Sequence, residues 1–291
     1  MNGNPRIIVG AIGTNDGSGE FGSAHVYERG SSTLTEIGDM LQPALISGES
    51  LQSRFGNSVG IAKDVNRVVV GAPFTNTGGN TDNGRVYTFD LAGNSWGSVG
   101  STLAGSEPGY LLGSSVDISD DGNWLVAGAP GSQSSNGGIF LYEWKDSGWE
   151  SYVPVPGSTD SELGSSVRFI SDDGKTFAFG APSFGNDQGA VRVYQESIDI
   201  PGFYLWLGNR NIEGQAGERI GTTLCGAQGR VGFGTDLGGF RVYDFANNAW
   251  NEVSTGPDDL GSKVVAMDMS KDGMMVVVGL ENEQVLVYEL S

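Results

Sequence analysis

The fold is indicated by the stretch Leu112-Gly113-Ser114-Ser115-Val116, which is followed by Ser119-Asp120-Asp121-Gly122, by Val126-Ala127-Gly128-Ala129-Pro130 and by Leu141-Tyr142. Each of these four parts recurs in the same order along the chain. The apolar run that leads into Gly-Ala-Pro has three full copies and three weaker ones, which begin at Ile7, Val68, Leu125, Phe177, Val231 and Val276. Self-similarity of this kind predicts a repeat architecture.

Each repeat contains short segments rich in Val, Ile, Phe and Tyr, bounded by Gly, Asn, Asp and Ser, which is typical of β-strands. We name them A (Gly-Ser-Ser-Val), B (the run into Gly-Ala-Pro), C (the run that ends in an aromatic residue) and D (which begins near a Trp). The A–B connections, such as Ser171-Asp172-Asp173-Gly174, predict tight hairpins because Asp-Gly readily takes the positive φ angles they need. No window carries a sustained 3.6-residue period, so we expect very little helix.

Four antiparallel strands repeated roughly every 50 residues predict an all-β chain that forms one β-propeller domain with six blades. The blades fall approximately at 5–51, 52–107, 108–158, 159–214, 215–256 and 257–291. The first blade lacks strand A and the last lacks strand D, because the chain opens on a B strand and stops on a C strand. A seven-bladed ring therefore remains an alternative. We expect Ile7-Ile8-Val9 to move inward and serve as the innermost strand of the first blade, with a strand added by a partner chain or a larger ring as the alternatives.

The repeat resembles the FG-GAP repeat of integrin α-subunit propellers and related surface proteins, and Phe55-Gly56 and Gly71-Ala72-Pro73 spell its name. The resemblance implies a propeller that binds proteins, a role in cell adhesion and an extracellular or cell-surface location. Members of the family often bind Ca²⁺ in the A–B loop through D-x-D-x-D-G-x-x-x-D. The loops here are short and lack the carboxylate after the Gly, so we expect turn chemistry and no cofactor, with Ca²⁺ as the alternative.

The composition excludes several classes of protein. The 291 residues include 35 acidic and 16 basic ones, for a net charge of −19, which would repel nucleic acid. No run approaches 18 apolar residues, so no membrane insertion is expected. The single Cys allows no internal disulfide, and the single His excludes sites that need two imidazoles. No signal peptide is visible in Met1–Pro5, and we expect a monomer.

Two motifs mimic catalytic signatures. Gly17–Gly22 fits G-x-G-x-x-G, but a strand follows it where a nucleotide site needs a helix. Gly56–Gly60 fits the G-x-S-x-G of serine hydrolases, but Ser58 aligns with the A-strand serines of other repeats. His25 lies in a C strand, and Cys225 lies in an A strand near the axis, where we expect it to be buried. We therefore predict no catalytic residue and no enzyme activity.

The remaining signals concern binding. The regular tryptophans Trp96, Trp149, Trp206 and Trp250 are predicted to pack between blades. The A–B turns are alike, whereas the B–C and D–A connections vary and emerge at the same end of a blade, where recognition is usually placed. We predict a non-catalytic binding or adhesion module that uses these loops in blades 1–4, with a protein or a glycan as ligand. A carbohydrate-binding or glycoside-processing propeller with its site at the central channel is the alternative. The candidate binding residues are Asn15, Asp16, Phe74, Asn76, Tyr110 and Phe184, and no metal ligand is proposed.

Overall fold

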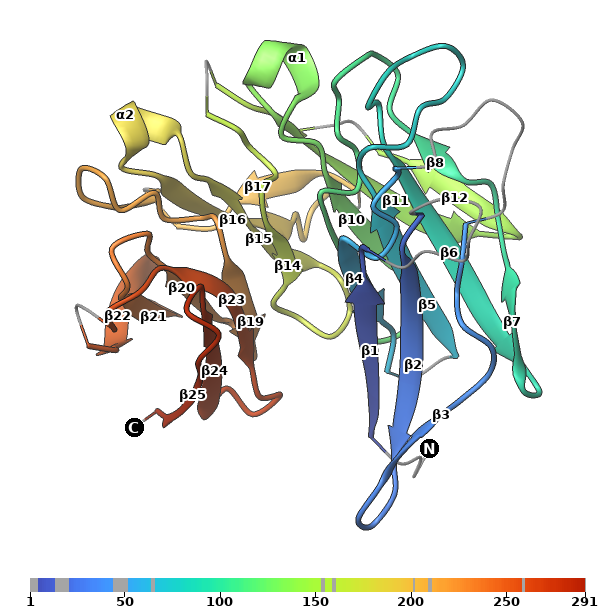
Figure 1. Cartoon of the computed structure of the whole chain (residues 1–291). Helices are drawn as coiled ribbons and strands as arrows, with labels where there is room; N and C mark the ends of the chain where they lie inside the picture. The colour runs from blue at the N-terminus through green and yellow to red at the C-terminus, as the bar shows by residue number, and fades with distance from the viewer. Residues whose placement is uncertain are drawn as a thin grey trace. The chain divides into compact units, whose positions relative to one another are not determined.

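The fold is a six-bladed β-propeller built from small antiparallel sheets (Figure 1). The computed structural model describes residues 5–13, 21–43, 52–63, 66–152, 155–158, 161–200, 202–208, 211–257 and 260–290. The chain divides into two compact units, Met1–Ser134 with Ile139–Pro154 and Ser135–Gly138 with Val155–Ser291. Blades 1 to 3 make up most of the first unit, and blades 4 to 6 belong to the second.

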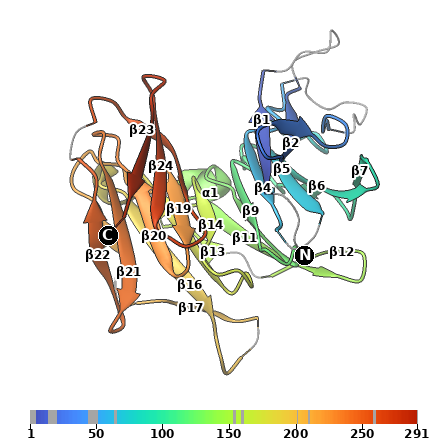
Figure 2. The same ribbon diagram turned by 90° about the horizontal axis from the view of Figure 1, so that it is seen from below.

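Strands A to D follow one another in each sheet, as in the order β4-β5-β6-β7 of blade 2 (Figure 2). The A strands are β4 (Ser58–Ile61), β9 (Ser115–Ile118), β14 (Val167–Phe169), β19 (Leu224–Ala227) and β23 (Val264–Met269). The B strands are β1 (Arg6–Ala11), β5 (Arg67–Ala72), β10 (Trp124–Gly128), β15 (Thr176–Ala181), β20 (Arg230–Gly234) and β24 (Met275–Leu280). The C strands are β2 (Ser23–Arg29), β6 (Arg85–Ala92), β11 (Gly138–Lys145), β16 (Ala190–Glu196), β21 (Phe240–Ala246) and β25 (Val285–Glu289). The D strands are β3 (Leu34–Glu36), β7 (Ser95–Ser98), β12 (Gly148–Ser151), β17 (Tyr204–Trp206) and β22 (Ala249–Thr255).

All predicted strands are present, and the first and last sheets have three strands each, β1-β2-β3 and β23-β24-β25. Three strands of two residues were not predicted: β8 (Leu103–Ala104), β13 (Val155–Pro156) and β18 (Ile212–Glu213). β8 and β18 pair with the start of the C strand in their own blades. β1 packs beside β4, the A strand of blade 2, as β4 packs beside β9. The position of β1 beside β4 agrees with the prediction that Ile7–Val9 forms the innermost strand of blade 1.

The glycines of the two repeat motifs interlock consecutive blades. The Gly56 N–H donates to the Gly71 carbonyl of its own blade, at 3.1 Å. A Cβ at Gly71 would lie 2.1 Å from the Gly113 carbonyl oxygen of the next blade, so only glycine fits there. Ser58 Oγ donates to the same Gly113 carbonyl at 2.8 Å, and Ser166 repeats this contact in blade 4. Ser58 is therefore a packing residue, as its place in the repeat predicted.

Apolar clusters lie between consecutive blades within each unit. One joins blades 1 and 2 around Phe55 and Val70, and another joins blades 4 and 5 around Phe233 and Ile220. The indole N–H of three D-strand tryptophans donates to the preceding blade: Trp96 to Ile37 O, Trp149 to Thr88 Oγ1 and Trp250 to Leu207 O. Their predicted packing role is confirmed. Trp206 differs, because it follows a longer loop and remains 46% exposed.

Arginines at the start of B strands form a second repeated joint. Arg67 donates from Nε and Nη2 to the Asp90 carboxylate, at 2.7 and 2.8 Å, and from Nη1 to the Gly122 carbonyl of blade 3, at 3.0 Å. Its guanidinium carbon lies 3.9 Å from the centroid of the Trp144 ring. Arg230 repeats the arrangement with Asp244 and with the Gly273 carbonyl of blade 6. Sequence analysis did not predict this joint.

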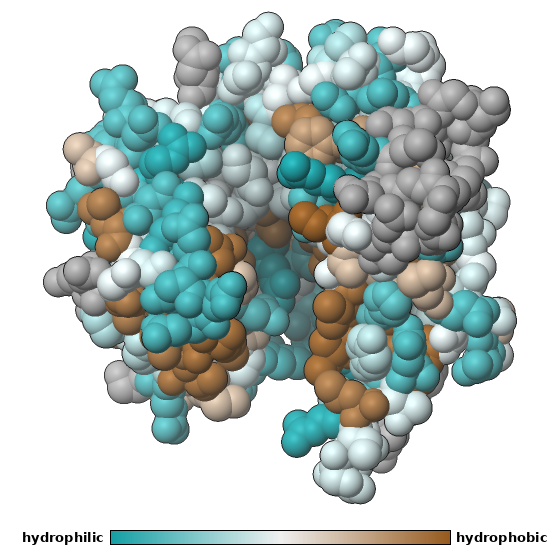
Figure 3. Space-filling model, viewed as in Figure 1, coloured by the Kyte–Doolittle hydropathy of each residue, from teal (hydrophilic) through white to brown (hydrophobic). Residues whose placement is uncertain are grey.

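The terminal sheets each expose one apolar face within the described part of the chain. Ile7 and Val9 of β1 are exposed, whereas Ile8 between them packs on the blade 2 core. The strands of the last sheet carry exposed apolar residues, namely Val265, Met275, Val277, Val285 and Val287. Figure 3 shows apolar side chains gathered over this sheet. None of the described helices is long and apolar enough to cross a membrane.

Candidate ligand-binding loop face

The two ends of the blades differ in their regularity. At the A–B end, Ser119 Oγ donates to Asp121 at 2.5 Å, and Asp121 Oδ1 accepts the Asn123 backbone N–H at 3.0 Å. The turns of blades 4 and 6 repeat these bonds with Ser171 and Asp173 and with Ser270 and Asp272. The aspartates thus bind their own turns, which is the turn chemistry that Asp-Gly predicted.

The other end, which we call the loop face, consists of the B–C and D–A connections and differs from blade to blade. Two connections contain four-residue helical segments, α1 (Ser132–Ser135) and α2 (Phe184–Asp187). Both carry left-handed backbone, with φ of 51° and 59° at Gln133 and Ser134 and of 64° and 60° at Gly185 and Asn186. They are therefore left-handed turns, and the expectation of very little helix holds for the described residues.

Strained backbone is concentrated on this loop face. Fifteen described non-glycine residues have positive φ. Four of them, Asp146, Gln228, Asn247 and Asn248, lie in tight A–B or C–D hairpins, which call for such angles. The other eleven lie in B–C or D–A connections. A left-handed L-residue costs about 1–2 kcal/mol, and strain of this kind clusters where a ligand is held or a switch operates.

One left-handed position recurs in four blades, directly before the apolar-Gly pair that begins each repeat, and we call it the pre-FG position. Its occupants are Arg54, Leu111, Glu162 and Arg219, with φ of 51°, 58°, 53° and 47°. Hydroxyls three residues later fix the backbone in three of the blades, since Ser114, Ser165 and Thr222 donate to the carbonyls of these residues at 2.8, 2.8 and 2.9 Å. The backbone is thus constant while the side chain is a cation, an apolar group or an anion.

In the first unit, the loop face holds three of the predicted site residues. The Arg54 guanidinium carbon lies 4.6 Å from the centroid of the half-buried Phe74 ring. Asn76 Oδ1 accepts the Asp82 N–H at 2.8 Å and so shapes the loop. The Tyr110 ring lies 5.6 Å from that of Phe140 and packs against the core of blades 2 and 3.

The blade 2 loop is tied to the D–A connection that follows it. Thr81 O accepts the Gly109 N–H at 2.8 Å, and the buried Asn83 donates to Gly105 O at 2.6 Å. Phe74, Asn76 and Tyr110 therefore belong to one cluster of hydrogen-bonded loops.

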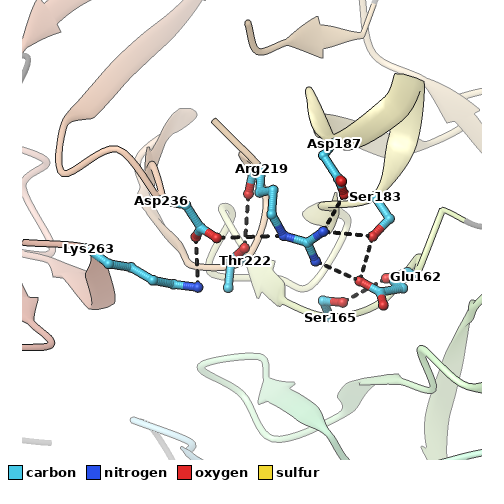
Figure 4. A network of polar contacts seen from close by, with 8 residues as sticks. All are labelled: Glu162, Ser165, Ser183, Asp187, Arg219, Thr222, Asp236 and Lys263. Carbon is cyan, nitrogen blue, oxygen red and sulfur yellow. Dashed lines mark hydrogen bonds and ion pairs between the residues drawn. The ribbon is translucent and has the colours of Figure 1, made fainter. Parts of the chain in front are cut away.

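In the second unit, the loop face carries a charged network centred on Arg219 (Figure 4). Arg219 Nη2 lies 3.1 Å from Glu162 Oε2, Nη1 donates to Asp187 and to Ser183, and Nε lies 3.6 Å from Asp236 Oδ2. Lys263 Nζ lies 2.9 Å from the other Asp236 oxygen. The network thus joins loops of three blades and holds three carboxylates around one guanidinium.

A second ion pair, between Glu218 and Arg241, holds the backbone next to this network. Glu218 is 6% exposed and accepts hydrogen bonds from both terminal nitrogens of Arg241 and from the Gln215 N–H. Burial acts to raise the pKa of Glu218, but these hydrogen bonds and the Arg241 charge outweigh it and hold the pKa below its ordinary value. The Asp236 N–H donates to Glu218 O at 2.8 Å, so the pair fixes the backbone that carries Arg219 and Asp236.

Phe184, the fourth predicted residue that the structure describes, begins α2 and lies 5.4 Å from the Arg192 guanidinium carbon. Burial lowers the pKa of Arg192. Asn15 and Asp16 lie outside the described residues. The structure thus places the four remaining predicted residues in B–C or D–A loops, three in the first unit and one in the second. Their role in binding a ligand stays a prediction.

The other residues singled out in the sequence have packing roles. Cys225 is fully buried as predicted, and burial raises the pKa of its thiol to about 12. His25 lies on β2, where Nδ1 is 2.6 Å from Glu36 Oε1 and Nε2 is 3.1 Å from Ser23 Oγ. The order Ser-His-Glu resembles a catalytic triad, but Ser23 has no exposed surface, so its hydroxyl is out of reach of a substrate. No group of three or more potential metal-binding His, Cys, Asp or Glu residues occurs among the described residues.

Comparison with known proteins identifies an FG-GAP repeat in one segment of the chain. Residues 48–89 match the family model described as FG-GAP repeat, which confirms the resemblance over this segment. A solved structure with a similar fold is the periplasmic gluconolactonase PpgL of Pseudomonas aeruginosa, with a TM-score of 0.64 and 15% sequence identity over 99% of this chain and 80% of that one. At this identity the likeness concerns the fold alone. No curated protein matches the sequence.

Sequence analysis missed the pre-FG positions and the Arg219 network. A signal was available, because Arg54, Leu111, Glu162 and Arg219 each stand directly before a recurring apolar-Gly pair. What the sequence could not supply is the sign of φ, since none of these residue types favours the left-handed region.

Proposed function

We propose that the chain is a non-catalytic interaction module that binds a protein partner through its loop face. The observation that carries this proposal is the strained, constant backbone of the pre-FG positions, which presents side chains of different chemistry in successive blades. Glycine would relieve the strain at each of them. A bulky or charged residue kept there at an energetic penalty is the pattern expected where the side chain contacts a ligand.

The contrast between the two ends of the blades supports the same assignment. The A–B turns satisfy their own polar groups in one repeated pattern, as in Ser119 and Asp121. The loop face instead varies from blade to blade, and in the second unit it carries the ion pairs of Glu162 and Asp187 with Arg219. Variable loops on a repeated scaffold are a common site of recognition.

The test uses matched double variants in the first unit. Arg54→Ser/Phe74→Ser removes one stacked pair from the loop face, and Lys63→Ser/Asp120→Ser removes one ion pair, at 3.5 Å, from the A–B end. Wild type and both variants are applied to an array of proteins and an array of glycans. We expect protein hits that the first variant loses and the second retains. Hits lost only by the second variant would place the site at the opposite end and refute the proposal.

A second candidate is a carbohydrate-processing propeller, and one observation favours it. Glu162 and Asp187 both contact Arg219, so two half-exposed carboxylates lie within reach of one small ligand. Paired carboxylates are the groups that glycoside hydrolysis uses. The gluconolactonase with a similar fold adds a lactone as a substrate to try. Hydrolysis of chromogenic glycosides or gluconolactone that Glu162→Gln and Asp187→Asn both abolish would favour this candidate over the binding module.

A further inference from the structure

A cavity of about 510 Å³ lies in the second unit between blades 4 and 5, at the A–B end and away from the loop face. Its lining includes Thr176 and Gln195 of blade 4, and Gly229 and Phe245 of blade 5. Ile170 and Leu207 add apolar surface. The volume falls within the range of small-molecule sites.

The repeat shows what this cavity corresponds to. Between blades 2 and 3, Arg67 begins its B strand, Asp90 pairs with it on the C strand, Gly122 supplies a turn carbonyl, and Trp144 supplies an aromatic face. We call this arrangement the arginine slot. The same positions between blades 4 and 5 are Thr176, its register partner Gln195, and Phe245 on the C strand. The A–B turn of blade 5 is shorter than that of blade 3, and its two residues, Gln228 and Gly229, both line the cavity.

The cavity is therefore an arginine slot whose arginine is replaced by a threonine. An aromatic face remains, the two-residue turn Gln228-Gly229 takes the place of the longer turn, and Gln195 has an amide oxygen where Asp90 has a carboxylate. The Gln195 side chain makes no hydrogen bond to a described residue, whereas Asp90 accepts two from Arg67. In blade 5 the corresponding slot is filled, because Arg230 pairs with Asp244 at 2.8 Å and reaches Gly273 O.

We propose that this cavity binds a guanidinium group supplied from outside the chain, as the side chain of an arginine or as a small guanidinium compound. The planar cation would stack on Phe245 and donate to Gln195 and to a carbonyl of the Gln228-Gly229 turn, in the manner of Arg67, which stacks on Trp144 and donates to Asp90 and Gly122 O. Its methylene chain would lie against Ile170 and Leu207. Arg230 and Asp244 also line the cavity, but they are paired with each other at 2.8 Å, and the net charge of −19 attracts cations to the protein as a whole.

The test titrates three probes into the whole protein and follows binding by calorimetry and by protein NMR. The probes are agmatine, acetyl-arginine amide and acetyl-lysine amide. We expect saturable binding of a guanidinium probe and none of the lysine probe, which is not planar and cannot stack in the same way. Binding of acetyl-arginine amide alone would identify an arginine side chain as the ligand, whereas equal binding of agmatine would include small guanidinium compounds. Equal binding of the lysine probe, or no binding of any probe, would overturn the proposal.

Two variants make the test specific. Phe245→Leu removes the aromatic face and is expected to weaken guanidinium binding about tenfold. Thr176→Arg/Gln195→Asp restores the arrangement of blade 2, so we expect binding to be lost and the unfolding midpoint to rise by several degrees. Binding that survives in the double variant would show that the probe lies elsewhere.

A matched gain-of-function variant provides an independent check. Arg67→Thr/Asp90→Gln opens an equivalent slot between blades 2 and 3, lined by Trp144. We expect this variant to bind acetyl-arginine amide at a second site and to regain part of its lost thermal stability at millimolar probe. If it binds no more probe than wild type does, the correspondence between the two slots is wrong. If Arg67→Thr/Asp90→Gln does not fold, binding to Thr176→Arg/Gln195→Asp still tests the proposal, which requires that this variant no longer binds the probe.

Discussion

Replacing Arg67 with Met should destabilise the first unit because Arg67 joins blades 2 and 3 at a buried position. The side chain is 10% exposed and makes three hydrogen bonds, two of them to the Asp90 carboxylate. It also stacks 3.9 Å from the Trp144 ring centroid. Hydrogen bonds between charged groups contribute about 1.5–3 kcal/mol each, and a desolvated cation–π contact contributes up to about 2 kcal/mol.

The net effect should be smaller than the sum of these contributions. Asp90 is 36% exposed and can regain water once Arg67 is gone, so the full penalty of about 3–5 kcal/mol for an unpaired buried charge does not apply. Met also retains most of the aliphatic packing. We expect a loss of about 3 kcal/mol. At roughly 2–4 °C per kcal/mol, the midpoint should fall by about 6–12 °C.

Thermal and urea unfolding followed by tryptophan fluorescence measure this loss. Arg6→Met is the matched control, since Arg6 holds the same repeat position and also donates to the next blade, to Asn66 Oδ1 at 2.5 Å, but is 30% exposed and lies 3.4 Å from Glu28. Exposed pairs contribute about 0–1 kcal/mol, so the control should shift the midpoint little. Equal shifts in the two variants would refute the claim that burial makes Arg67 a joint between blades.

Three further predictions follow from the structure. The folded-state pKa of Glu218 is lowered, so its contribution to stability is present above the ordinary value of about 4.3 and is lost as the pH falls through it and below. Wild type should therefore lose more stability between pH 5 and pH 3 than Glu218→Gln does, and equal losses in denaturant titrations would contradict this. Because Asp121, Asp173 and Asp272 bind their own turns, EDTA should move the unfolding midpoint by less than about 1 °C. A calcium-dependent gain near the roughly 2.7 kcal/mol expected of a site at 100-fold saturation would show a bound ion. Far-UV circular dichroism should show almost pure β structure, and a helix content above about 15% would contradict the propeller.

The strands and their order follow from the sequence because the determinants are local. Val-Ile-Phe-Tyr runs between Gly and Asp turns need only short-range preferences, and Ser171-Asp172-Asp173-Gly174 forms the hairpin that its residues favour. The repeat also predicts contacts between blades, which no single segment reveals. Trp96, Trp149 and Trp250, for example, each donate a hydrogen bond to the preceding blade. Trp206 differs from these tryptophans, because it follows a longer loop and its side chain remains exposed.

The candidate site was harder to predict because it depends on contacts between distant segments. Arg219 meets Glu162, which lies 57 residues earlier, and Arg67 meets Gly122, which lies 55 residues later. Sequence analysis favoured aromatic residues in loops, and of these Tyr110 packs against the core. The strain at the pre-FG positions is imposed by the surrounding hydrogen bonds, so residue type alone does not reveal it.

The central claim is that loop-face strain is maintained for recognition, and a glycine variant of blade 3 tests it most directly. Gln133 and Ser134 are exposed and left-handed, and their side chains make no hydrogen bond to a described residue. Gln133→Gly/Ser134→Gly should therefore raise the unfolding midpoint by about 2 °C or more, since a left-handed L-residue costs about 1–2 kcal/mol. We expect this more stable variant to lose protein-array hits that wild type shows. A lower midpoint, or a higher midpoint with every hit retained, would contradict the claim.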